Sequence, residues 1–220
     1  MFGKTLKIVI PVLFVPVVIG STKAAFQTLE NISLFNINLY LAIGGFFAYP
    51  IFHIVFFKPM YIYAAGHETV HVLATWLCGG KVTSFHVSQA GGNVTTTKTN
   101  PFIRLSPYFV PIHTIALFLL YGILSKFYNM SGFFNEFIFF VGFTMSFHIF
   151  MTIEVMKMRQ PDIVKTGYLF SVFCIYVANI FVAILVLNFI FSGVSFVFFA
   201  KKTFVLSKDI YINIFSNLAS

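Results

Sequence analysis

The sequence predicts an all-α polytopic membrane protein of about six transmembrane helices, with a small β-hairpin inserted after the third helix. Composition is the first observation behind this fold class: of 220 residues, 59% are hydrophobic and only 9% are charged. A soluble domain carries about 25% charged residues, so this chain has too little polar surface to cover a globule in water. The second observation is that the apolar residues are gathered in long runs, which cross a bilayer as helices because a helix satisfies its own backbone groups.

The formal net charge of +8 comes from 14 Lys and Arg against 6 acids. The basic residues are scattered in ones and twos between apolar runs, with no stripe that could follow a phosphate backbone, so we expect no nucleic-acid partner. Basic residues that flank membrane spans explain the charge better, with the lipid bilayer as the partner. Cys78 and Cys174 form no closely spaced pair, which argues against a disulfide framework and a cysteine-based metal site.

The first apolar run, Ile8 to Gly20, follows Lys4 and Lys7 and is short for a span. Its length resembles the core of a signal peptide. Pro11 and Pro16 lie inside the run, and the segment that follows is a weak cleavage site. We therefore expect a retained first helix.

The second and third runs are predicted to form a tight antiparallel helical hairpin. The second run, Ile37 to Phe57, is long enough to cross a bilayer and is broken by the Lys-Pro pair at 58–59. The third run, Met60 to Leu77, ends at the Gly-Gly pair at 79–80, a common helix stop.

Residues 81–100 change character and predict a β-hairpin. Apolar residues alternate with Thr, Ser, His and Asn, and Gly91, Gly92 and Asn93 indicate the turn. Three further apolar runs then predict helices, at Phe102 to Leu124, Phe133 to Met156 and Tyr168 to about Phe199. The last run is too long for one ordinary span, and we expect it to tilt or to break near Asn188 or the Ser-Gly pair at 192–193. The lysines and arginines divide evenly between the two sides, so they do not predict the orientation.

The sequence His67-Glu68-Thr69-Val70-His71 is an H-E-x-x-H motif. Residues four apart lie on one face of a helix, so both imidazoles can bind one Zn²⁺. In this motif the glutamate acts as the general base toward the attacking water, which is the role predicted for Glu68. Two imidazoles and a carboxylate in an apolar helix are costly to bury, which favours a functional site over a polar helix interface without metal.

The stretch Gly66-His67-Glu68-Thr69-Val70-His71-Val72-Leu73-Ala74, followed by Gly79-Gly80-Lys81-Val82, resembles the site-2 protease family of intramembrane zinc metalloproteases, the M50 class. The resemblance covers about 40 residues, and the Lys81–Asn100 segment fits the family's short β-rich insertion. It implies hydrolysis of membrane-spanning or membrane-adjacent protein substrates. Residues 1–220 would then form a single integral-membrane metalloprotease domain.

The resemblance also implies a third metal ligand, an Asp on a later membrane helix. The matching candidate is Asp162, although Gly167 follows five residues later and not immediately, as in the family's usual Asp-Gly context. Asp162 is also suited to cap the helix that opens near Ile163. The alternative ligand is His148, which shares one helix face with Thr144 and Thr152, although its position fits a group that supports a ligand or faces the substrate better.

Other polar residues of the apolar runs are interpreted as structural. Glu154 is expected at the interface, and His53, His86 and His113 as histidines satisfied by hydrogen bonds. The alternative function is a polytopic metal-binding membrane protein without proteolytic activity, such as a transporter or a scaffold. A transporter would place several ionisable residues along a path, whereas here they gather around one motif. Substrate identity and oligomeric state are left open by the sequence.

Overall fold

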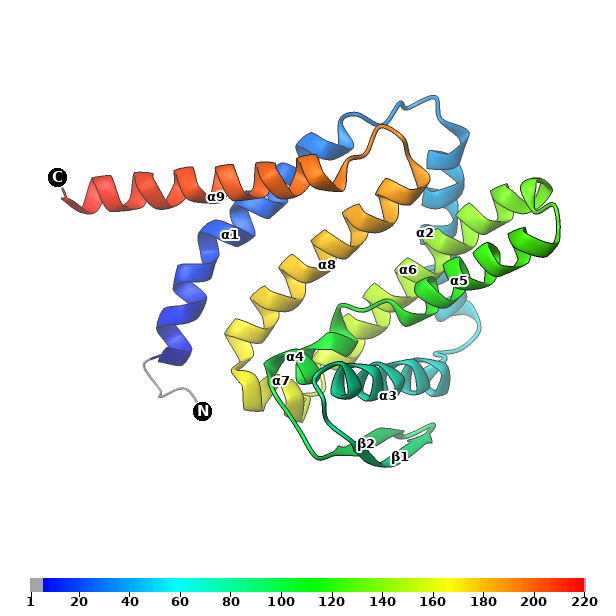
Figure 1. Ribbon diagram of the computed structural model, residues 1–220, viewed down its shortest axis with the longest axis horizontal. Helices are drawn as coiled ribbons and strands as arrows, with labels where there is room; N and C mark the ends of the chain where they lie inside the picture. The colour runs from blue at the N-terminus through cyan, green and yellow to red at the C-terminus, as the bar shows by residue number, and fades with distance from the viewer. Residues whose placement is uncertain (1–5, 220) are drawn as a thin grey trace. The chain divides into compact units, whose positions relative to one another are not determined.

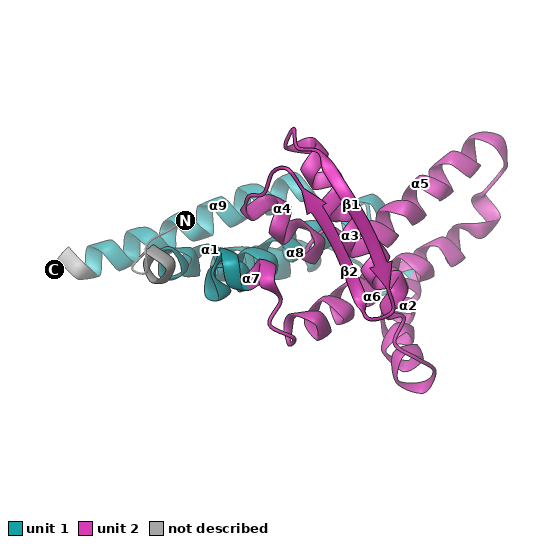
Figure 2. Ribbon diagram, turned by 90° about the horizontal axis from the view of Figure 1, so that it is seen from below, with its two compact units in different colours: residues 1–36, 164–220 teal, residues 37–163 magenta. Residues whose placement is uncertain are grey.

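The computed structural model describes residues 6–219, which form helices and one two-stranded sheet (Figure 1). The elements are α1 (Leu6–Leu29), α2 (Ile37–Val55), α3 (Met60–Leu77), β1 (Val82–Ser88), β2 (Gly91–Thr96), α4 (Pro101–Leu105), the 3-10 turn Ser106–Tyr108, α5 (Ile112–Phe127), the 3-10 turn Ser131–Phe133, α6 (Phe134–Met156), α7 (Pro161–Thr166), α8 (Tyr168–Ile190) and α9 (Phe196–Ala219). Two compact units are distinguished, residues 37–163 and residues 1–36 with 164–220 (Figure 2). The single-domain organisation stays a prediction.

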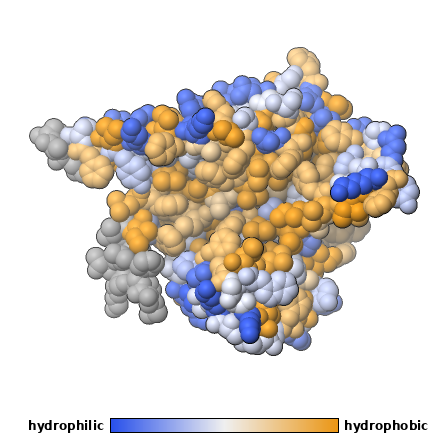
Figure 3. Space-filling model, in the orientation of Figure 1, coloured by the Kyte–Doolittle hydropathy of each residue, from blue (hydrophilic) through white to orange (hydrophobic). Residues whose placement is uncertain are grey.

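Four helices of the described residues are long and apolar enough to cross a membrane: Ile10–Leu29, Ile37–Val55, Ser131–Met156 and Tyr168–Ile190. A fifth span results if the bent pair Pro101–Tyr108 and Ile112–Phe127 is counted as one. Hydrophobic side chains cover much of the visible surface (Figure 3). These features agree with the predicted all-α polytopic membrane fold. They give fewer spans than the predicted six, because α3 and α9 carry too many polar residues to meet the same criteria.

Helices α2 and α6 share the most extensive helix–helix contact of the 37–163 unit, and glycines allow their approach. A Cβ added at Gly45 would overlap the carbonyl of Phe139, and one at Gly142 would overlap the carbonyl of Ala42. Small residues of this kind let membrane helices pack backbone against backbone. The ring of Tyr49 is then completely covered, with its centroid 5.3 Å from that of Phe147.

The run predicted as one helix from Phe102 to Leu124 is instead broken, and this prediction was wrong. Helix α5 follows the preceding helical segment at an angle of 71°. Pro107 and Pro111 explain the break, because each lacks an N–H donor and restricts the residue before it. The break lets the short α4 segment lie against α3 while α5 packs along α6.

The predicted hairpin is present, but its turn lies two residues earlier than expected. Strands β1 and β2 pair antiparallel, with Phe85 opposite Val94 and Ser88 opposite Gly91. The chain reverses at Gln89 and Ala90, and Gly91 opens the second strand with a φ of 130°, a conformation that favours glycine. Both strands pack on α3.

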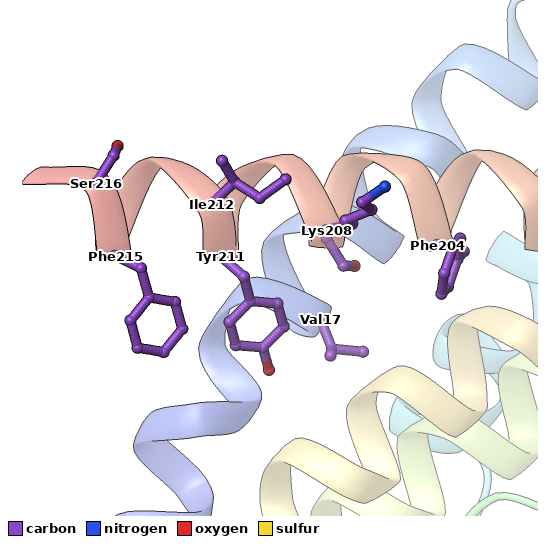
Figure 4. A pocket seen from close by; sticks show the side chains of 8 residues that line it. Val17, Phe204, Lys208, Tyr211, Ile212, Phe215 and Ser216 are labelled. Carbon is purple, nitrogen blue, oxygen red and sulfur yellow. The ribbon is translucent and has the colours of Figure 1, made fainter.

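In the other unit, α1 packs against α8 and α9. The predicted break of the last long run is confirmed: α8 ends at Ile190 and α9 begins at Phe196. The Asn188 side chain accepts a hydrogen bond from the Phe196 backbone N–H at 2.9 Å and so stabilises the turn between them. A groove lined by α1 and α9 shows Val17, Tyr211 and Phe215 on one side (Figure 4).

Candidate metal centre

Helix α3 places His67, Glu68 and His71 as the motif predicts. The helix is continuous from Met60 to Leu77, so the two imidazoles lie one turn apart. Their ring centroids are 4.9 Å apart. This pair forms one half of a potential metal site.

Asp162 completes the group from a distant part of the chain. It lies in the first turn of α7, and its Oδ2 is 3.4 Å from Nε2 of His71. One ligand atom from each of His67, His71 and Asp162 falls within 4.8 Å of the other two. No such group that contains His148 is found among the described residues. The structure therefore brings together the three residues that the sequence analysis named as ligands.

The donor types, and the distance between His71 and Asp162, fit a tetrahedral metal ion. Two ligands bonded at about 2.0–2.1 Å to a tetrahedral zinc would lie ~3.4 Å apart, which is the separation of His71 and Asp162. Two imidazoles and one carboxylate are borderline donors that suit zinc, and three protein ligands leave one position open. Nδ1 of His67 is buried without a hydrogen-bond partner among the described residues, so this imidazole has a polar atom that a bound group could satisfy.

The orientation of His71 is set by a backbone carbonyl. Nδ1 of His71 donates a hydrogen bond to the Ile103 carbonyl at 2.9 Å, which leaves Nε2 free to face Asp162. Metal-binding histidines commonly use the second nitrogen in this way. The Ile103 N–H in turn donates to the Asn100 side chain at 2.8 Å, which caps α4. The Asn100 cap therefore fixes the position of Ile103, whose carbonyl orients His71.

Glu68 lies beneath the hairpin. Its residue exposure is 6%, and a Cβ at Gly92 would overlap its side chain, with Oε1 2.8 Å away. Glu68 and His67 also line a cavity of about 190 Å³ that is bounded by the Gly91–Gly92 backbone. The carboxylate is therefore shielded by protein on one side and open to a cavity on the other. This arrangement suits a base that must meet one water molecule.

Around His67 the walls are aromatic. The Tyr108 ring lies edge-on to the imidazole with centroids 5.0 Å apart, and the Tyr63 ring is tilted at 5.7 Å. His148 is 4% exposed and lines a small space with His67 and His113. His148 therefore lies beside the candidate site, next to His67, where its imidazole could help to orient that side chain.

Two other polar residues of the apolar runs, His53 and Glu154, bond to partners outside the candidate site. His53 shares a hydrogen bond of 2.9 Å with the Tyr49 hydroxyl. Glu154 pairs with Lys58 at 2.5 Å and with Lys157 at 3.4 Å, as expected for an interfacial carboxylate. Neither residue belongs to the His67–His71–Asp162 group.

Three residues that contact the site were not predicted from the sequence: Ile103, Gly92 and Tyr108. The Asn100-Pro101 pair is a local sign of a helix start, but it does not tell which carbonyl reaches His71. The second glycine of the 91–92 pair was interpreted as part of a turn, whereas its role is to leave space for Glu68. No local pattern distinguishes Tyr108 from the other tyrosines.

Comparison of the chain with protein-family models, curated proteins and solved structures finds no match.

Proposed function

We propose that this chain is an integral-membrane zinc metalloendopeptidase that cleaves membrane-spanning or membrane-adjacent protein segments. The observation that carries the proposal is the convergence of an H-E-x-x-H helix and Asp162 on one point, with Glu68 beside it at a cavity. A site with three protein ligands and one open position is typical of catalytic rather than structural zinc. The two long apolar helices of the same unit, Ile37–Val55 and Ser131–Met156, favour a substrate that reaches the site from the bilayer.

The chain would hold the ion with His67, His71 and Asp162. When bound there, zinc would polarise the scissile carbonyl and acidify the attacking water. Glu68 accepts a proton from that water and returns it to the leaving amine. His71 is kept in place by the Ile103 carbonyl, and the hairpin excludes bulk solvent from Glu68.

The hairpin also offers a way to hold the substrate. A peptide bond must be extended to expose its carbonyl, and an unpaired strand edge presents N–H and C=O groups at strand spacing. The β1–β2 sheet has only two strands and ends at the wall of the cavity beside Glu68. Pairing of a substrate segment with this sheet would place its backbone next to the base.

Replacement of Glu68 tests the chemistry separately from metal binding. Glu68→Gln removes the proton acceptor and keeps the shape, so we expect cleavage of a labelled single-span polypeptide to fall by about 10²–10⁴-fold in detergent micelles. Zinc content, measured by elemental analysis, should stay the same. Glu136→Gln, at an exposed carboxyl in α6, is the matched control. Undiminished cleavage by the Glu68 variant would reject the mechanism.

The same measurement of zinc content tests the third ligand. Asp162→Ala should lower the metal stoichiometry, because two imidazoles alone bind zinc weakly, whereas Asp209→Ala at an exposed carboxyl should not. Loss of zinc on His148→Ala with retention on Asp162→Ala would reverse the assignment. Bound zinc without cleavage of any substrate would instead favour the metal-binding alternative.

A further inference from the structure

The cavity beside Glu68 has walls from three separate segments of the 37–163 unit. One wall is the N-terminal half of α3, which contributes Met60, Tyr63 and Ala64. A second wall is the backbone at Gly91 and Gly92, and the third is the end of α6 with the residues that follow it, including Val155 and Met158. The volume is about 190 Å³, enough for a side chain and too little for a folded segment.

The cavity lies directly beside His67 and Glu68. His67 and Glu68 belong to its lining, so a group that enters it stands next to the position where the scissile carbonyl would lie. Ala64 lies one helical turn before Glu68 on α3, and its small side chain leaves room there. A substrate residue that flanks the scissile bond would point its side chain into this space.

The chemistry of the walls restricts that side chain. Methionine, valine and alanine side chains give part of the wall an apolar surface, and Tyr63, His67 and Gln160 add polar groups. Glu68 is the one carboxylate among the lining residues. An acidic substrate side chain would be repelled by Glu68, and a basic one would pair with it and block its role as a base. Either charge would also be desolvated without a suitable partner.

We propose that this cavity is the specificity pocket of the enzyme and accepts an uncharged side chain of medium size, such as Leu, Met or Phe, next to the scissile bond. The proposal rests on the proposed proteolytic function and adds the class of residue that the site selects. Apolar pockets discriminate by about 10–200-fold for a missing methylene group. A substrate with Leu at this position should therefore be cleaved at least ~10-fold faster than one with Ala, and one with Asp or Lys should be cleaved least.

The test uses a set of single-span polypeptides that differ only at the residues flanking the cleavage site, with Leu, Met, Phe, Ala, Asp or Lys. The full-length protein is compared with Ala64→Phe, which fills the cavity, and kcat/KM is measured for each substrate. Filling the pocket should lower kcat/KM for the Leu, Met and Phe substrates and leave that for the Ala substrate unchanged. The variant should then cleave the Ala substrate faster than the Leu substrate.

Ala64 is buried, so a second variant guards against misfolding. Met158 is 55% exposed and tolerates a larger side chain, and Met158→Trp should shift the preference in the same direction. Leu77→Trp, at an exposed position at the far end of α3, is the control. Zinc content reports whether each variant keeps its site.

The outcomes separate the two proposals. Cleavage by the wild-type protein with no apolar preference, or a preference that neither pocket variant alters while zinc is retained, overturns the pocket and leaves the protease intact. Absence of cleavage for every substrate rejects the proteolytic function and the pocket with it. Reversal of the preference in either variant, but not in Leu77→Trp, supports the pocket.

Discussion

Gly92 shows how a single residue without functional groups can belong to the site. It does not adopt the left-handed conformation, unlike its neighbour Gly91, so its backbone geometry is open to other residues. Its side of the strand faces Glu68, and any Cβ there would meet the Glu68 side chain. The absence of a side chain at position 92 is therefore a steric requirement set by the carboxylate.

A methyl group at position 92 should move the base without touching the metal ligands. Gly92→Ala forces the Glu68 side chain out of its position, so we expect kcat to fall by about tenfold or more while zinc content is retained. The measurement is steady-state cleavage together with metal analysis. Gly122→Ala is the matched control, because a Cβ there meets nothing within 4 Å. Equal activity of the two variants would show that Glu68 does not need the space.

At the scale of elements, α4 is important despite its five residues. It is too short to be stable by itself, and it depends on the Asn100 cap and on packing against α3. The break at Pro107 and Pro111 separates it from α5, so it can turn its Ile103 carbonyl toward His71. The break at the two prolines thus helps to orient His71 in the candidate metal centre.

Removal of the cap should weaken metal binding indirectly. Asn100→Ala deletes the acceptor for the Ile103 N–H, which costs about 1 kcal/mol of local stability, and we expect zinc affinity to fall several-fold. The measurement is a competition titration with a chelator. Asn100→Asp or Asn100→Ser retains a capping oxygen and should restore most of the affinity. Failure of both to do so would point to the contact of Asn100 with Cys78 instead.

At the scale of the whole molecule, the packing of α2 against α6 is the main helix contact of the 37–163 unit. The two helices run in the same direction, since the glycine contacts pair Ala42 with Gly142 and the ring contacts pair Tyr49 with Phe147. The Lys58–Glu154 ion pair lies near the same end of both. Parallel spans must begin on the same side of the membrane, so α5 is required to return the chain between them.

This direction predicts the membrane topology of the unit. In a background without the two native cysteines, Asn129→Cys lies before α6 and Phe57→Cys lies after α2, both at exposed positions. A membrane-impermeant maleimide should label them from opposite sides of sealed vesicles. Labelling of both residues from one side would contradict the parallel arrangement of α2 and α6 as membrane spans.

The sequence by itself determined most of the long helices, the hairpin and the pair of histidines on α3, although it did not predict the break between α4 and α5. These features depend on spacing along a few turns of chain, where periodicity and glycine or proline positions are sufficient. It also named Asp162 and His148 as the candidates for a third ligand. Which of them lies next to His71 depends on the path of about 90 residues from His71 to α7, which no local pattern encodes.

Only the tertiary structure decided what surrounds the motif. It placed Asp162 3.4 Å from Nε2 of His71, aimed the Ile103 carbonyl at the other nitrogen of that ring, and set Gly92 against Glu68. Each of these contacts joins segments far apart in sequence, and each depends on packing between elements. Local chemistry selects the residues that can bind a metal, whereas long-range packing determines which of them meet.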